Sequence, residues 1–83
     1  MKTIVYTLPN CSQCETTKRL MTANNIEFEE LALQDHPEKA QEFIEKGHKT
    51  APIVDTGSKV WSGFRYEEIK ALAQHLDTER AKS

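Results

Sequence analysis

Two cysteines lie three residues apart near the start of the chain, in the segment Cys11-Ser12-Gln13-Cys14. A cysteine at the opening of a helix is stabilised as the nucleophilic thiolate by free backbone N–H groups and by the positive end of the helix dipole. A second cysteine within one turn is close enough to attack a mixed disulfide formed on the first and to release the partner. The spacing therefore predicts thiol–disulfide exchange, with Cys11 as the attacking sulfur and Cys14 as the resolving one.

Two other uses of the cysteine pair have less support. A structural disulfide here would close a very short loop, and stabilisation by loop closure grows with loop length. Structural zinc needs four ligands, whereas the chain has two cysteines, and His36, His48 and His75 are far from one another in the sequence. Two cysteines in a reducing compartment are more often catalytic than structural.

Length and composition limit the other possibilities. A chain of 83 residues forms one small domain, which we assign to residues 1–83. The formal net charge is −2 and no basic run is present, so we do not expect nucleic acid as a partner. Pro9 interrupts the N-terminal apolar segment too early for a signal peptide, and no long apolar stretch follows. We therefore expect a soluble, cytoplasmic protein with no membrane partner.

The cysteine pair is expected at a turn between a strand and a helix. Residues 2–7 are rich in β-formers and run into Pro9-Asn10, which indicates a buried strand ended by a turn. Residues 12–24 have the periodicity of an amphipathic helix, and alternating apolar residues predict a second strand over 26–31. Two strands joined across a helix pair in parallel, so this half of the chain predicts a βαβ unit.

The second half of the chain predicts a helix, a hairpin and a last helix. Asp35 with Glu38 resembles a capping box at the start of a helix. A glycine-containing turn between two β-rich runs indicates an antiparallel hairpin, and apolar residues at helical spacing follow it. The expected ranges are 36–46 for the first of these helices, 52–54 and 59–61 for the hairpin strands, and 65–76 for the last helix, with a polar tail at 77–83 that is expected to fray.

The order βαβαββα, with Cys-x-x-Cys at the first strand-to-helix turn, resembles the thioredoxin fold in its minimal, glutaredoxin-like form. This is an α/β fold with a four-stranded mixed sheet flanked by three helices. Within that superfamily the chain resembles the NrdH-redoxins over essentially its whole length. Three segments carry the resemblance, of which the last is the most specific: Cys11-Ser12-Gln13-Cys14, Ala51-Pro52 and Trp61-Ser62-Gly63-Phe64-Arg65.

The resemblance implies a dithiol electron carrier that reduces protein disulfides. Its electron acceptor would be the large subunit of a class Ib ribonucleotide reductase, through the cysteines of a flexible C-terminal tail. Its donor would be thioredoxin reductase, which uses NADPH. The chain itself would bind no cofactor beyond its redox-active disulfide and would act as a monomer. Three alternatives stay open: a glutathione-dependent glutaredoxin, an iron–sulfur or metal-carrying module that uses Cys11 in a dimer, and a non-enzymatic thioredoxin-like adaptor.

The resemblance also implies a partner-binding surface around the cysteines. The Ala51-Pro52 bond would be cis, which would leave polar backbone groups of residue 51 free to pair with an extended substrate. Trp61 would be a partly exposed docking residue, with burial in the core as the alternative, while Phe64 would anchor the last helix in the core. The expected partner-binding residues are Ser12, Gln13, Thr50, Ala51, Pro52, Trp61, Ser62, Gly63, Phe64 and Arg65.

Two positions depart from the family pattern. Leu8 stands where family members and glutaredoxins often have a cation, and Tyr66 stands where a proline often follows the Trp-Ser-Gly-Phe-Arg segment. Glutaredoxins also hold glutathione with a Gly-Gly-x-Asp-type segment, which is absent from this chain. We therefore expect glutathione to be a poor reductant of the protein.

Overall fold

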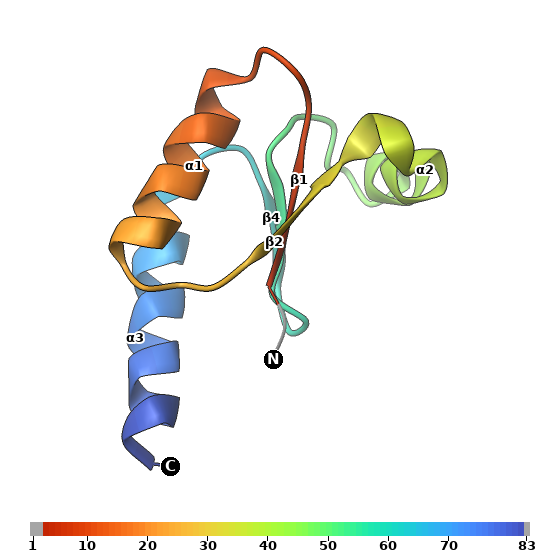
Figure 1. Ribbon diagram of the computed structural model, residues 1–83. Helices are drawn as coiled ribbons and strands as arrows, with labels where there is room; N and C mark the ends of the chain where they lie inside the picture. Colours follow the sequence, from red (N-terminus) through yellow and green to blue (C-terminus); the bar gives the residue numbers. More distant parts are fainter. Residues whose placement is uncertain (1–2, 83) are drawn as a thin grey trace.

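A computed structural model describes residues 3–82 of the chain and places helices on both faces of one sheet (Figure 1). A short 3-10 helix, η1 (Leu33–Asp35), precedes the second α-helix. The other elements, in chain order, are β1 (Ile4–Thr7), α1 (Ser12–Ala23), β2 (Glu29–Ala32), α2 (Pro37–Glu45), β3 (Ile53–Asp55), β4 (Val60–Ser62) and α3 (Tyr66–Lys82).

The four strands form one mixed sheet in the order β2-β1-β3-β4. Strand β1 pairs in parallel with β2, as expected for a βαβ unit, and antiparallel with β3. The hairpin strands β3 and β4 pair antiparallel. The observed architecture confirms the predicted glutaredoxin-like fold, and the sheet brings the end of β1, the start of β3 and the end of β4 to one edge.

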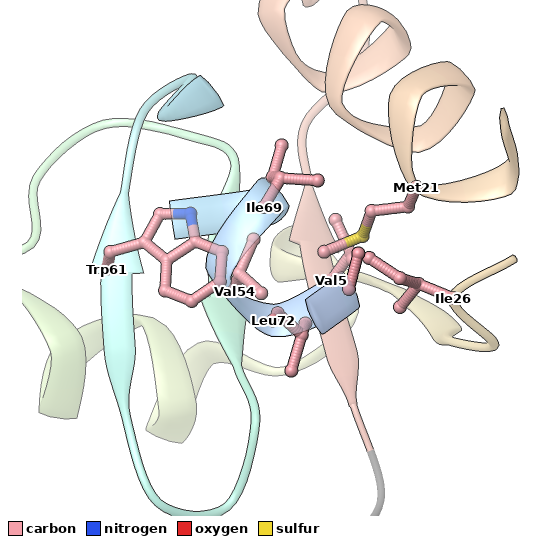
Figure 2. Close-up of a cluster of buried hydrophobic side chains, with 8 residues drawn as sticks. Val5, Met21, Ile26, Val54, Trp61, Ile69 and Leu72 are labelled. Carbon is pink, nitrogen blue, oxygen red and sulfur yellow. The ribbon is translucent and has the colours of Figure 1, made fainter. Parts of the chain in front are cut away.

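Helices α1 and α3 cover one face of the sheet, and the main core lies between these helices and the sheet (Figures 1 and 2). Successive side chains of a strand point to opposite faces, so paired residues of neighbouring strands share a face. Val5 pairs with Val54, and Val54 pairs with Trp61, so all three face the two helices. The core cluster on this face consists of Val5, Met21, Ile26, Val54, Trp61, Ile69, Leu72 and Ala73.

Helix α2 covers the opposite face with a smaller core (Figure 1). Tyr6 and Ile53 are cross-strand partners, and both pack in a cluster with Leu33 and Phe43. The Tyr6 and Phe43 rings meet edge to face with centroids 5.0 Å apart. None of the helices in the described part of the chain has the length and apolar character that a membrane span requires.

Three local predictions differ from the structure. Strand β2 begins at Glu29 instead of residue 26, because Ile26 packs in the core under α1 before the chain joins the sheet. The capping box is not formed, since Asp35 ends η1 and the N-cap of α2 is His36, with no side-chain cap.

The third difference is at the C-terminal end, where α3 continues to Lys82. The segment from Asp77 to Lys82, expected to fray, is therefore helical, and Ser83 lies outside the described residues. The contact between His75 Nε2 and Glu79 Oε1, at 3.0 Å, links successive turns. Side-chain pairs four residues apart support a helix in this way even when few apolar residues remain.

Candidate redox site

The first cysteine lies directly at the start of α1. Cys11 is the N-cap residue, with extended backbone angles (φ −112°, ψ 103°), and its carbonyl accepts the first helical hydrogen bond from the Glu15 N–H at 3.2 Å. The Cys14 N–H donates to Cys11 Sγ at 3.1 Å. The sulfur therefore takes the place of the oxygen that usually caps a helix, where free N–H groups stabilise negative charge.

The two cysteines form a disulfide with their Cα atoms 5.2 Å apart. Cys14 is inside the protein, with 1% of its surface exposed, whereas Cys11 is half-buried. A disulfide of a partner can therefore reach Cys11, whereas the buried Cys14 is accessible only to the sulfur of Cys11. This is the arrangement that the predicted roles of attacking and resolving thiol require.

The loop before β3 faces the cysteines. The Ala51-Pro52 peptide bond is cis, as the resemblance implied, and Pro52 is buried. The Pro52 carbonyl accepts a hydrogen bond from the Gly63 N–H at 2.8 Å, which ties this loop to the end of β4. Within the described residues the Ala51 backbone has no hydrogen-bond partner, so its polar groups are available to an extended peptide.

An open groove of about 460 Å³, which we call the redox groove, lies between these two loops. Its lining brings together five of the predicted site residues, which are Cys11, Ser12, Gln13, Thr50 and Ala51. Lys49 and Leu8 also line the groove; neither was predicted as a site residue, and Leu8 was noted only as a departure from the family pattern. Their proximity to Ala51-Pro52 and to Cys11 in the sequence was the signal available.

Gln13 joins the cysteine turn to the segment after β4. Its side-chain Oε1 accepts a hydrogen bond from the Phe64 N–H at 3.3 Å. Gly63 has φ +79°, a backbone conformation that glycine adopts without steric cost, and this turns the chain toward Gln13. Gln13, which was expected to bind a partner, thus also connects two loops of the site.

The two aromatic residues near the site differ from the prediction in their exposure. Trp61 is 5% exposed and belongs to the core under α1 and α3 (Figure 2). The interpretation of Trp61 as an exposed docking residue is therefore wrong, because its pairing with Val54 fixes it on the covered face. Phe64 was expected in the core, but it follows the turn at Gly63 and is 38% exposed.

The remaining predicted residues, Ser62 and Arg65, support the end of β4. Ser62 Oγ lies 3.2 Å from His48 Nδ1, and the Arg65 Nε–H donates to the Ser62 carbonyl at 3.5 Å. His48 was not predicted as a site residue, and no sequence pattern singles it out. The structure places neither Ser62 nor Arg65 among the residues that line the redox groove.

Metal-ligating side chains are not clustered in the described part of the chain. Across the described residues, no three His, Cys, Asp or Glu side chains are grouped so that they could hold a metal ion.

Comparison with known proteins gives the family. The glutaredoxin family model matches residues 3–61. The glutaredoxin-like protein NrdH of Salmonella typhimurium is 38% identical over 72 residues, which cover 87% of this chain and 89% of that protein. The chain belongs to the glutaredoxin family, among the NrdH-type proteins. The NrdH protein of Lactococcus lactis (strain IL1403) is 35% identical over 69 residues, 83% of this chain and 96% of that protein.

Solved structures agree with this NrdH-type assignment. The NrdH-redoxin of Escherichia coli, described as having a thioredoxin-like activity profile, is 36% identical with a TM-score of 0.82. That match covers 87% of this chain and 95% of the E. coli chain. A glutaredoxin from Archaeoglobus fulgidus has a TM-score of 0.67 at 26% identity, over 86% of this chain and 84% of that one. Together with the Cys11–Cys14 pair, the NrdH-type fold supports thiol oxidoreductase chemistry.

Proposed function

We propose that this protein carries electrons from thioredoxin reductase to a class Ib ribonucleotide reductase. The observation that carries the proposal is the placement of Cys11, half-buried at a helix start and beside the unpaired Ala51 backbone, in a NrdH-type chain. The similarity to the E. coli NrdH-redoxin and its thioredoxin-like activity profile supports a protein partner over glutathione as the source of electrons.

In the proposed reaction the Cys11 thiolate attacks one sulfur of the partner's disulfide. The partner's S–S bond breaks, its second sulfur leaves as a thiolate, and a mixed disulfide forms on Cys11. Cys14, after losing its proton, then attacks Cys11 Sγ and releases the partner's first sulfur. Two electrons and two protons pass to the partner, which becomes a dithiol, and Cys11–Cys14 becomes the disulfide that thioredoxin reductase reduces.

The partner's target segment would pair with Ala51 as an extended strand. Its backbone would then donate to and accept from the free groups of residue 51, while its cysteine lies over Cys11 in the redox groove. The large subunit of the reductase would present such a segment through the cysteines of its C-terminal tail. A flexible tail suits this role because it can adopt the extended conformation that the groove requires.

Two reducing systems distinguish this proposal from a glutathione-dependent glutaredoxin. The oxidised protein is incubated with thioredoxin reductase and NADPH, and separately with glutathione, glutathione reductase and NADPH, and NADPH oxidation is followed. Among the described residues that line the redox groove, Lys49 alone could pair with a carboxylate of glutathione, and Leu8 stands where glutaredoxins often have a further cation. Because so few groups could hold glutathione, we expect much slower reduction by it. Comparable rates from the two systems would contradict the proposal and favour the glutaredoxin function.

A further inference from the structure

An apolar cavity, which we call the apolar groove, lies beside α2. Its volume is about 340 Å³. Two of its residues are large and aliphatic yet remain uncovered, since Leu8 is 43% exposed and Ile44 is 47% exposed. Exposed apolar surface gathered in a groove indicates a binding site more often than scattered apolar residues do. The apolar lining includes Leu8, Leu33, Pro37, Ala40, Ile44 and Ile53.

The apolar groove is continuous with the redox groove. The two share Leu8, Lys49, Thr50 and Ala51 in their linings. A peptide that pairs with Ala51 and brings a cysteine to Cys11 therefore passes the residues that the two grooves share. One residue of an extended chain advances by about 3.3 Å, so we infer that a side chain placed against these shared residues belongs to a residue close to the target cysteine.

The charges at this junction favour an acidic occupant. Lys49 lines both grooves and is exposed. Neither lining includes an aspartate or glutamate from the described residues. A carboxylate on the bound segment would meet a cation there without a competing acidic side chain, although the whole chain has a net charge of −2.

We propose that Leu8 and Ile44 form a specificity subsite for a large aliphatic side chain adjacent to the target cysteine of a partner protein. A carboxylate of the same partner segment faces Lys49. The inference rests on the proposed reduction of protein disulfides and adds the chemistry of the segment that is reduced. Leu8 is the determining residue, because it lines both grooves and a cation at its position would place a charge beside the aliphatic side chain of the partner.

Short peptides test the subsite. Each contains one cysteine as a mixed disulfide with thionitrobenzoate and carries Leu or its polar isostere Gln at one flanking position, before the cysteine in one series and after it in the other. The reduced protein attacks the peptide sulfur, the mixed S–S bond breaks, and thionitrobenzoate leaves as a coloured thiolate. The second-order rate of its release is measured for the protein and for three variants, Leu8→Gln, Ile44→Gln and Tyr66→Gln.

In at least one series we expect the Leu peptide to react about tenfold faster than the Gln peptide, a difference of about 1.4 kcal/mol. The ratio should fall toward one in Leu8→Gln and Ile44→Gln. It should be unchanged in Tyr66→Gln, which alters an exposed residue outside both grooves. Equal rates for Leu and Gln peptides in both series, or a ratio that survives Leu8→Gln, would overturn the proposal.

A second comparison tests the contact with Lys49. A Leu peptide that also carries Glu is expected to react a few-fold faster than the same peptide with Gln in place of Glu. Lys49→Gln should remove that advantage while leaving the preference for Leu. No advantage for the Glu peptide would contradict the role of Lys49.

A small aromatic disulfide without a peptide distinguishes failure of the subsite from failure of the proposed thiol chemistry. If the protein and its variants reduce this disulfide at equal rates while showing no preference for Leu, the subsite is wrong and the thiol chemistry stands. If the unaltered protein fails to react with it, the proposed function itself is wrong.

Discussion

The side chain of Gln13 accepts a hydrogen bond from the backbone N–H of Phe64, so a residue between the two cysteines is joined to the turn that follows β4. The next residue back, Gly63, donates its N–H to the Pro52 carbonyl. The cysteine turn, the proline loop and the end of β4 are therefore connected through two hydrogen bonds. These bonds link the two walls of the redox groove.

Replacing Gln13 with Ala should lower the free energy of unfolding by about 0.5 kcal/mol, the low end of what one hydrogen bond contributes, because this bond is exposed. Denaturant unfolding of the oxidised protein measures the change. Gln74→Ala, at an exposed position of α3, is the matched control and should not lower stability. Equal effects of the two substitutions would show that the bond to Phe64 contributes nothing.

The burial of Trp61 leads to a second prediction. Truncation of a buried tryptophan to Ala costs about 3–5 kcal/mol, a large share of the roughly 5–15 kcal/mol by which a small domain is stable. Trp61→Ala should therefore shift the unfolding midpoint strongly, whereas Tyr66→Ala, at a residue that is 52% exposed, should change stability by less than about 0.5 kcal/mol. A Trp61 variant that keeps its stability and loses only partner binding would contradict the core assignment.

The difference in exposure between the cysteines predicts their reactivity. When the reduced protein is treated with limiting iodoacetamide, Cys11 should be modified first, because its sulfur is accessible and accepts the Cys14 N–H while Cys14 is buried. Peptide mapping by mass spectrometry identifies the modified residue. In denaturant both cysteines should react alike. Preferential modification of Cys14 in the folded protein would reverse the assigned roles.

The ion pair between Lys18 and Glu30 gives a pH dependence. Lys18 Nζ lies 3.0 Å from Glu30 Oε2, and this hydrogen bond, assisted by the Thr7 hydroxyl, lowers the pKa of Glu30 below its ordinary value of 4.5. Hydrogen bonds to Glu15 and Glu30 raise the pKa of Lys18 above 10.5. The stability that the Glu30 carboxylate contributes is complete above pH 4.5 and is lost as the pH falls through its lowered pKa. The stability that the Lys18 ammonium group contributes is lost as the pH rises through its raised pKa.

Glu30→Gln should therefore reduce stability at pH 7 by about 0.2–1 kcal/mol, the usual range for an exposed pair, and the difference should shrink toward pH 3. Unfolding measured at both pH values checks this. Glu45→Gln makes the same charge change at an exposed position of α2 and should show a smaller effect. A Glu30→Gln effect that is equal at pH 7 and pH 3 would exclude the ionic contribution.

Local patterns in the sequence were enough to predict the element order and the position of the cysteine pair. Strand β1 and helix α1 have clear periodicities, and Cys11 falls between them. The cis bond before Pro52 was predicted from the family resemblance, because composition alone does not indicate it.

The parts that could not be predicted depend on contacts between distant segments. The burial of Trp61 follows from its register with Val54 and Val5, and a one-residue shift would have placed it on the other face. Phe64 is exposed because the chain turns at Gly63 before α3 begins. Lys49 reaches the redox groove through the path of the loop before β3, which no local pattern determines.

The most direct test of the proposed electron transfer is to trap the mixed disulfide on Cys11. The reduced Cys14→Ser variant, mixed with the oxidised large subunit of a class Ib ribonucleotide reductase, should accumulate a mixed disulfide that dithiothreitol releases. Mass spectrometry should locate it between Cys11 and a cysteine of the C-terminal tail of the large subunit, and Cys11→Ser should trap nothing. Failure of Cys14→Ser to form this adduct, or an adduct that forms equally with Cys11→Ser, would contradict the proposed electron transfer.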